Sequence, residues 1–286
     1  SFFLVTFEDE REEVREAGWT YLVATHLGTA FLFVLFTLLG RHAGSMNFDQ
    51  FTAISAASPT LAAVLFLLAL VGFGTKAGFM PLHVWLPEAH PAAPSHVSAV
   101  MSGVMIKLGI YGILRTLTFL GPPPAWWGQT FLMIGMTSGV LGVLFALAQH
   151  DLKRLLAYHS VENIGIIALG LGIGLLGQSA GQPVMSLLGF GGALLHVLNH
   201  SLFKALLFLG AGSVLHATGT RELDRLGGLF KAMPWTGTAF LIGATAICGL
   251  PPLNGFVSEW LIYVGGFRGF LEFQTRSGMW LGLGIA

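Results

Sequence analysis

Charged side chains are scarce in this sequence. The 286 residues include 14 basic and 14 acidic side chains, which make up 10% of the chain and give a formal net charge of zero. Because a soluble domain carries about 25% charged residues, this chain has too few to cover a water-facing surface. The balance of charge also leaves no basic field to attract nucleic acid. We therefore expect a membrane protein with no nucleic-acid partner.

Cysteine is almost absent, since Cys248 is the only one. A single cysteine excludes a disulfide within the chain, a zinc site built from several thiolates, and an iron–sulfur cluster held by this chain alone. We expect no cofactor and no redox centre in the chain. Whether it works as part of an enzyme then depends on electron transfer in other subunits.

Long apolar runs dominate what is present. Hydrophobic residues make up 54% of the chain, and the mean hydropathy is +0.74. Five stretches without Asp, Glu, Lys or Arg are each at or above the roughly 20 residues that a membrane-spanning helix requires. They are Ala17–Gly40, Gln50–Thr75, Thr116–His150, Asn163–Phe203 and Ala232–Ser258. Since these stretches lack the alternation of a membrane β-strand, we predict an all-α polytopic membrane protein.

The helix positions follow from the same runs. After a partial span that ends near Phe7, spans are predicted at about Thr20–Leu39, Pro59–Leu86, Pro94–Leu120, Gln129–Ala148, Tyr158–Leu176, Val184–His216 and Trp235–Phe267, with a last one that begins near Gly278. No basic signal-peptide region opens the sequence. We expect the chain to be a fragment that lacks residues before Ser1 and after Ala286.

The loops differ in positive charge. One side of the membrane receives Arg11, Arg15, Lys153, Arg154, Arg221, Arg225 and Lys231, and the other receives Arg41, Arg268 and Arg276, with Arg115 at a helix end. The positive-inside rule places the more basic side in the cytoplasm.

Two of the expected spans are interrupted by glycine and proline. Gly72, Gly74, Gly78 and Pro81 interrupt the first, and residues 249–255 interrupt the second with the sequence GLPPLNG. Broken helices at membrane depth are tolerated only against protein or a wet cavity, because their backbone groups need partners. Matching breaks in two halves of a chain indicate a transport site built from inverted repeats.

Several ionisable residues fall inside apolar spans, where a charge costs at least about 2.5 to 3.5 kcal/mol. Lys76 precedes Pro81 in the first break, where free carbonyls can stabilise an ammonium group. Lys107 lies near the middle of its span, too far from either surface to snorkel. His26 also falls within a span. We interpret the two lysines as proton-relay residues and His26 as a secondary candidate.

A four-residue spacing joins His196, His200 and Lys204 on one helix face. Waters between these groups would complete a proton ladder. A metal site is the rival interpretation, but the glutamate of the zinc-protease motif does not follow His196, so no metal is expected. Histidines satisfied by neighbouring hydroxyls remain a further alternative.

Carboxyl groups supply the other candidates. Glu259 follows the second break and is interpreted as a proton-holding group, although Trp260 and Tyr263 also favour a water boundary there. His159 and Glu162, near the start of a span, are secondary candidates for the pathway. We expect His83, His90 and His96, which flank a proline-rich run, at a water boundary.

Four motifs carry a family resemblance. They are KAGFMPLHVWLPEAH at residues 76–90, IKLGIYG at 106–112, DLKRLLAYHS at 151–160 and HSLFKAL at 200–206. In this order they resemble the antiporter-like subunits shared by respiratory complex I, Mrp sodium/proton antiporters and group 4 membrane-bound hydrogenases. The segment 90–105 and the opening FLVTFEDE at 3–10 are most similar to the hydrogenase-4 and formate hydrogenlyase branch.

The resemblance implies two inverted repeats of five helices, each with one broken helix. Residues 1–148 would hold the later part of the first repeat and the start of the second, and residues 149–286 the rest of the second. Lys76, Lys107, His200 with Lys204, and Glu259 match the family's line of mid-membrane charges. The family's glutamate partner for Lys76 would lie before Ser1, and Glu8 is too near the loop to replace it.

The function that this implies is proton translocation in the plasma membrane of a prokaryote, within a redox-driven complex. The expected partners are other membrane subunits and a peripheral arm that carries iron–sulfur clusters and reduces quinone or works as a hydrogenase. Protons, and in one variant sodium ions, would be carried. Two alternatives remain: a subunit of an Mrp-type sodium/proton antiporter, and a non-conducting anchor for a peripheral hydrogenase.

Overall fold

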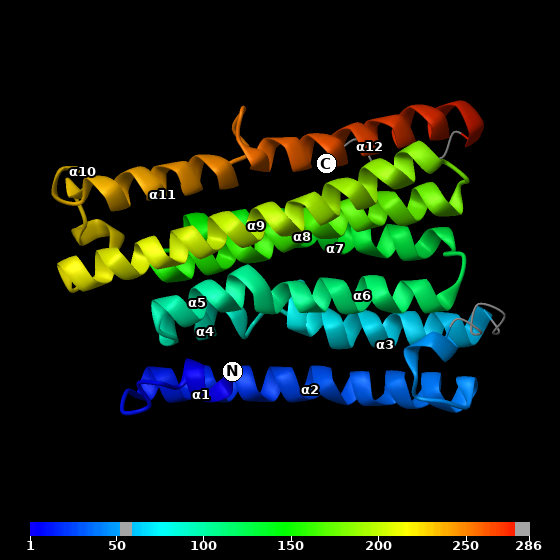
Figure 1. Cartoon of the computed structure of the whole chain (residues 1–286), viewed down its shortest axis with the longest axis horizontal. Helices are drawn as coiled ribbons and strands as arrows, with labels where there is room; N and C mark the ends of the chain where they lie inside the picture. Colours follow the sequence, from blue (N-terminus) through cyan, green and yellow to red (C-terminus); the bar gives the residue numbers. More distant parts are fainter. Residues whose placement is uncertain (52–58, 278–286) are drawn as a thin grey trace.

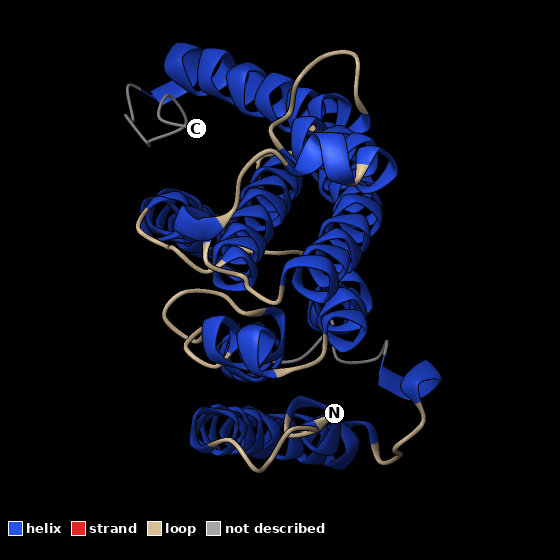
Figure 2. Cartoon of the chain, turned by 90° about the vertical axis from the view of Figure 1, so that its left-hand side faces the viewer, coloured by secondary structure: helices blue, strands red, loops and turns tan. Residues whose placement is uncertain are grey.

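Helices run nearly side by side along the long axis of the molecule in a computed structural model that describes residues 1–51 and 59–277 (Figures 1 and 2). The span predicted to begin near Gly278 lies outside the described residues. The helices are α1 (Phe2–Val5), α2 (Glu12–Ala43), α3 (Pro59–Ala77), α4 (Leu86–Ala92), α5 (Ser95–Val100), a π-helix η2 (Met101–Met105), α6 (Ile106–Leu120), α7 (Ala125–Leu147), α8 (Leu152–Ser179), α9 (Pro183–Thr218), a 3-10 turn η3 (Leu223–Arg225), α10 (Leu229–Ala232), α11 (Pro234–Ile247) and α12 (Asn254–Ser277).

The prediction of an all-α polytopic membrane protein is confirmed. Within the described residues, six segments are long and apolar enough to cross a membrane: α2, α3, α5 to α6, α7, α8 and α9. The span predicted over Trp235–Phe267 is divided into α11, which is only 14 residues long, and α12, which carries charged residues.

Both predicted helix breaks are confirmed. In the first, α3 ends at Ala77, Gly78 takes the left-handed φ of 84°, and α4 begins at Leu86. In the second, α11 ends at Ile247, Gly249 has a φ of 62°, and α12 begins at Asn254. A side chain would strain both glycines, because positive φ is disfavoured for residues with a Cβ. Figure 1 shows α11 and α12 end to end across the second break.

Side chains hold each break in place. The Trp85 indole nitrogen donates to the Thr75 carbonyl across the first break, at 2.8 Å. The Asn199 side chain donates to the Asn254 carbonyl at the start of α12, at 2.7 Å. These bonds partner carbonyls beside the breaks, as membrane depth requires.

Local sequence signals set the ends of α8 and α9, the two helices that carry most of the site. Asp151 caps α8 by accepting a hydrogen bond from the Arg154 backbone nitrogen at 2.9 Å. Pro183 opens α9, where its missing N–H costs nothing, and Gly219 ends it in the left-handed conformation. The cap and the two end signals make both helices longer than the spans predicted from hydropathy.

Glycines bring α8 close to its neighbours. A Cβ on Gly165 would lie 2.6 Å from the Gly139 backbone nitrogen of α7, and one on Gly189 would lie 2.4 Å from the Gly174 backbone nitrogen of α8. Small residues at helix contacts are the usual way in which membrane helices gain packing energy. As a result α8 is the most enclosed of the six candidate spans.

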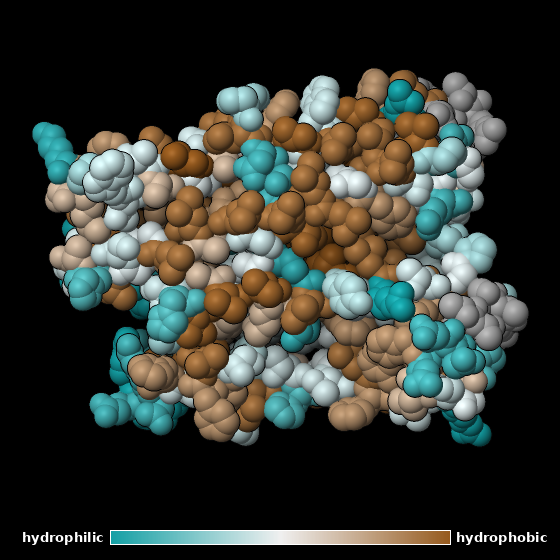
Figure 3. Space-filling view, in the orientation of Figure 1, coloured by the Kyte–Doolittle hydropathy of each residue, from teal (hydrophilic) through white to brown (hydrophobic). Residues whose placement is uncertain are grey.

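Polar residues gather toward the two ends of the bundle, and apolar residues dominate the middle of the face in Figure 3. At one end, Arg11, Arg154 and Arg221 line a common cavity, although they come from the residue before α2, from α8 and from the loop after α9. This agrees with the prediction that these loops share one side of the membrane.

Candidate functional site

A chain of contacts joins the two buried lysines predicted for the proton pathway. Lys204 of α9 is fully buried, and its Nζ donates to the Leu156 carbonyl of α8 at 2.6 Å. The same carbonyl accepts from Ser160 Oγ at 3.1 Å, and Ser160 Oγ lies 2.8 Å from Ser102 Oγ. Lys107 Nζ in turn donates to the Ser102 carbonyl. Polar groups therefore connect Lys204 to Lys107 across three helical segments.

The π-helix η2 supplies part of this line of polar contacts. Ser102 belongs to η2, and α6 continues from it at Ile106, one residue before Lys107. A π-helical turn inside a longer helix is a frequent mark of a functional site, because it changes the direction in which local backbone groups point. Here Ser102 contacts Lys107 with its carbonyl and Ser160 with its hydroxyl.

Buried positive charge is concentrated at this place. Lys107 is 7% exposed and Lys204 0%, and their charges are close enough to act on each other. Within the described residues their hydrogen-bond partners are backbone carbonyls, with no carboxylate in ion-pair contact. Two like charges repel strongly in such surroundings, so protonation of one ammonium opposes protonation of the other.

The histidines of α9 continue the line from Lys204. His200 is fully buried, and neither of its ring nitrogens has a hydrogen-bond partner among the described residues. Its ring stacks with that of His196, with centroids 6.3 Å apart and planes at 15°. The predicted common face of His196, His200 and Lys204 is therefore present and points inward.

His196 is held from both sides. Its Nε2 donates to Asn163 Oδ1 of α8 at 3.1 Å, because the Asn163 amide nitrogen already donates to the His159 carbonyl. Its Nδ1 lies 3.0 Å from Ser258 Oγ of α12. A neutral His196 then accepts at Nδ1, so its tautomer is set by these two partners.

Carboxyl groups lie beyond His196. Glu259 follows Ser258, and its Oε2 lies 2.5 Å from where a Cβ on Gly249 would be, so the carboxylate covers the second break. His159 and Glu162 are hydrogen-bonded to each other on α8, with Nδ1 and Oε2 2.5 Å apart. The charge of Glu162 reaches both Lys204 and Glu259.

Two predicted pathway residues have no contact with this line of polar groups among the described residues. Lys76 is half-buried at the end of α3 and has no hydrogen bond or ion pair to another described side chain. The helices that carry the two lysines do pack together, since a Cβ on Gly109 of α6 would lie 2.6 Å from the backbone nitrogen of Ala77 in α3. His26 is exposed on α2, and its Nδ1 bonds to the Leu22 carbonyl of its own helix.

Other polar residues of the site were missed from the sequence. Ser102, Ser160, Asn163 and Ser258 are all fully buried linkers, and Lys153, assigned to a loop, is 1% exposed and donates to the Ala93 carbonyl. Serines and asparagines in an apolar run give no distinctive signal. The signal available for Lys153 was its place inside the motif at residues 151–160.

The structure contradicts the expected position of His90. It was expected at a water boundary, but it is fully buried and its ring stacks on Phe208 of α9, with centroids 4.7 Å apart. The short helix α4 turns inward after the first break and carries His90 with it. His96, on α5, is exposed as expected.

Replacing Asn163 by alanine tests the support of His196. The change leaves His196 Nε2 without its partner and is expected to reduce the free energy of unfolding by about 1 kcal/mol, the usual scale for a polar contact between membrane helices. Denaturant unfolding in detergent micelles measures this effect. The control is Asn47→Ala, an exposed asparagine. Equal stability of the two variants would contradict the assigned bond.

The fold and site define a polytopic helical membrane subunit with two broken helices and a buried line of lysines and histidines. The chain belongs to the family described as NADH:quinone oxidoreductase/Mrp antiporter, TM, whose profile matches residues 1–274. This confirms the resemblance found in the four motifs and the assignment to a membrane.

Comparison with individual proteins supports the same family assignment. The chain is 51% identical over 263 residues to hydrogenase-4 component B of Escherichia coli (strain K12), covering 91% of this chain and 39% of that protein. It is 44% identical over 251 residues to formate hydrogenlyase subunit 3 of the same strain, covering 88% of this chain and 41% of the relative. The chain thus spans about two fifths of the length of these relatives.

Solved structures share the fold. The Mrp complex from Dietzia sp. DQ12-45-1b contains a chain that superposes with a TM-score of 0.80 at 27% identity, covering 91% of this chain and 46% of that one. The higher identities to the two Escherichia coli proteins agree with the predicted hydrogenase and formate hydrogenlyase branch. Subunits of this family work in complexes with other membrane subunits.

Proposed function

We propose that the chain is the proton-conducting part of an antiporter-like subunit in a redox-driven membrane complex of the hydrogenase-4 or formate hydrogenlyase type. The observation that carries the proposal is the buried line of polar contacts from Lys107 through Ser102, Ser160 and the Leu156 carbonyl to Lys204. Charges this deep are costly, and a role in ion movement is the default explanation for them.

The mechanism uses the repulsion between the two lysines. When Lys107 gains a proton, its charge opposes the one on Lys204, so Lys204 releases its proton toward His200. The His200 nitrogens lack protein partners, and a polar site of this kind is satisfied by water, which carries the proton onward. His196 then passes it through the Ser258 side toward Glu259, with His159 and Glu162 as a second acceptor pair.

Lys76 and His26 take the outer positions in this proposal. Lys76, at the first break, is the group through which a neighbouring subunit changes the charge near Lys107. His26 is placed on the same route because it lies within a candidate span. Electrons move in a peripheral hydrogenase or quinone-reducing arm, and the carried ion is the proton.

We propose the same division of the chain as the sequence predicted. Residues 1–148 hold the first break with Lys76 and the helix with Lys107, and residues 149–286 hold the His196 to Lys204 face and the second break with Glu259. The two breaks support this, since each combines a left-handed glycine with prolines that interrupt the helix.

The test is redox-driven acidification of sealed vesicles that contain the full parent complex. Lys107→Ala is expected to lower the proton gradient by about tenfold or more at a matched electron-transfer rate, because a positioned proton carrier is lost. Lys231→Ala, which changes an exposed lysine on α10, serves as the control and is expected to behave like the wild type.

The rival functions predict different results. A non-conducting anchor predicts an undiminished gradient in Lys107→Ala, and this outcome would overturn the proposal. A subunit of an Mrp-type antiporter predicts sodium-dependent proton exchange without any redox substrate. The relatives with the higher identity favour the redox-driven complex over that alternative.

A further inference from the structure

A large groove between α6 and α9 is not used by the pathway proposed above. Its volume is about 600 Å³, within the range of about 300 to 1,000 Å³ that ligand pockets usually have. Figure 3 shows a hollow with an apolar floor between these two helices. The lining residues are mostly apolar and include Leu114, Leu117, Thr118, Leu175, Phe190 and Leu194.

The groove forms where α6 and α9 no longer touch. The two helices approach each other at η2, where a Cβ on Gly103 would lie 3.3 Å from the Ser201 carbonyl oxygen. Farther along α6, the groove follows the helix from Leu114 to Gly121, a length of about 10 Å. It therefore extends from the loop after α6 into the part of the bundle that lies within the membrane.

Neither water nor empty space suits this groove. A bound water needs about two to four polar partners, and the polar lining side chains, Thr118 and Gln178, both lie near the ends of their helices. An empty groove would leave its lining atoms without dispersion contacts. Because α6 and α9 both belong to candidate membrane spans, a lipid chain is the apolar occupant available at this depth.

Arg115 lies beside the outer end of the groove and has no carboxylate partner among the described residues. It is half-buried within the candidate span that ends at Leu120, and its guanidinium lies 5.1 Å from the centroid of the Phe119 ring. The hydroxyl of Thr118, a lining residue, donates to the Arg115 carbonyl at 2.7 Å. A charge within a span is costly when unpaired, and phosphate is an anion that the arginine fork matches.

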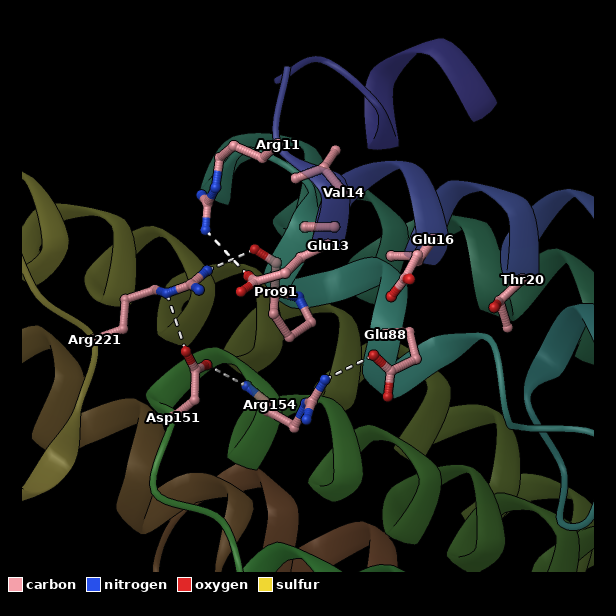
Figure 4. Close-up of a pocket in the computed structure, with 12 residues that line it drawn as sticks. Arg11, Glu13, Val14, Glu16, Thr20, Glu88, Pro91, Asp151, Arg154 and Arg221 are labelled. Carbon is pink, nitrogen blue, oxygen red and sulfur yellow. Dashed lines mark hydrogen bonds and ion pairs between the residues drawn. The ribbon is translucent and has the colours of Figure 1, made fainter. Parts of the chain in front are cut away.

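The arginines at the opposite end of the bundle are paired. In Figure 4, Arg154 contacts Glu88 at 2.7 Å and Arg221 contacts Asp151 at 3.1 Å. The positive-inside rule places that end in the cytoplasm. Arg115 differs from these arginines because its counter-charge must come from outside the described residues.

We propose that the groove between α6 and α9 binds an anionic phospholipid of the non-cytoplasmic leaflet, with an acyl chain in the groove and the phosphate against Arg115. A lipid with net negative charge is favoured because no carboxylate of the described residues balances the arginine. The bound lipid would fill the space between the helices that carry Lys107 and Lys204. This inference goes beyond the proposed function and does not rest on proton conduction.

The first test is photo-crosslinking in the intact parent complex, reconstituted with phosphatidylglycerol that carries a diazirine on one acyl chain. Mass spectrometry of the peptides is expected to find the label near Leu117 and Leu194. The corresponding phosphatidylcholine probe is expected to label these positions several-fold less. A protein helix seated in the groove predicts no label there, and that result would overturn the inference.

Two variants with matched controls separate the groove from the arginine. Leu194→Trp fills the groove and is expected to reduce labelling near Leu117 several-fold, whereas Leu202→Trp, at an exposed leucine outside the groove, leaves it unchanged. Arg115→Gln is expected to remove the preference for phosphatidylglycerol, whereas Arg41→Gln, exposed at the same end, retains it. Wild-type labelling and lipid preference in both Leu194→Trp and Arg115→Gln would show general lipid contact and contradict a specific site.

A second measurement uses the stability of the delipidated complex. Adding phosphatidylglycerol is expected to raise its apparent melting temperature by several degrees more than phosphatidylcholine does, because a ligand of the folded state stabilises that state. Arg115→Gln is expected to reduce this difference, and Arg41→Gln to preserve it. An undiminished difference in Arg115→Gln would exclude Arg115 as the phosphate partner.

Failure of the lipid site and failure of the proposed function give different results. If Lys107→Ala stops pumping and the lipid probe does not label the groove, the lipid site is wrong and the proposed function stands. If Lys107→Ala pumps normally and the groove is labelled with the expected preference, the lipid site stands and the proposed function is wrong.

Discussion

Replacing Lys204 by alanine is expected to abolish redox-driven proton translocation, with a decrease of about 100-fold or more relative to the wild type. Lys204 is fully buried, contacts the Leu156 carbonyl, and lies one helical turn from His200. Among the described residues, it contacts the line to Lys107 through the Leu156 carbonyl and shares a helix face with the α9 histidines. Without its ammonium group, the Leu156 carbonyl loses its contact with α9 and the proton loses a carrier between Lys107 and His200.

The measurement is the proton gradient in sealed vesicles at a matched electron-transfer rate. Lys204→Arg separates charge from proton transfer, because an arginine stays protonated and cannot release its proton. Both variants are expected to stop pumping. Full pumping by Lys204→Arg would mean that only a fixed positive charge is needed, and full pumping by Lys204→Ala would overturn the relay. Purified yield of the complex shows whether each variant assembles.

Gly189→Val is expected to have the largest effect on folding. A Cβ on Gly189 would lie 2.4 Å from the Gly174 backbone nitrogen and 2.7 Å from the Gly170 carbonyl oxygen. Neither atom can move without displacing α8 from α9, so the expected loss is about 3 kcal/mol of unfolding free energy or more. The two helices also carry the site, and their separation would part Lys204 from Leu156.

The matched control is Gly191→Val on the same helix, where a Cβ would meet nothing within 4 Å. The two variants have the same change in composition and helix propensity, so they differ only in helix contact. We expect a monodisperse protein of normal yield from Gly191→Val and a low or aggregated yield from Gly189→Val, measured by size exclusion in detergent. Equal yields would contradict the close approach of α8 and α9.

The sequence predicted the helical membrane class, both helix breaks and the approximate places of the spans. Several helix ends were wrong by more than a turn: α2 begins at Glu12 and not near Thr20, and α3 ends at Ala77 and not at Leu86. The features predicted correctly depend on local composition: an apolar run of sufficient length, or a glycine and proline that interrupt it. It also predicted the shared face of His196, His200 and Lys204, because a four-residue spacing needs only the period of one helix. The role of these residues in proton transfer stays a prediction.

The contacts between helices could not be predicted from the sequence in this way. Ser102 and Ser160 are 58 residues apart, and nothing in either local sequence indicates that their hydroxyl groups meet. Lys153 was assigned to a loop because it is charged. It is enclosed in the structure because α8 begins immediately before it and packs under α4. His90 was expected at a water boundary for a similar reason, since a proline-rich run gives no information about the direction of a short helix after a break.

By itself, the sequence determined that this protein is a membrane bundle with two interrupted helices and more ionisable groups inside it than packing requires. The tertiary structure decided which of those groups form one line, which linkers join them, and that Lys153 and His90 lie inside. The physical reason is the range of the interactions: hydropathy and helix period act within a span, whereas burial and hydrogen bonding of these side chains depend on helices brought together by glycine contacts.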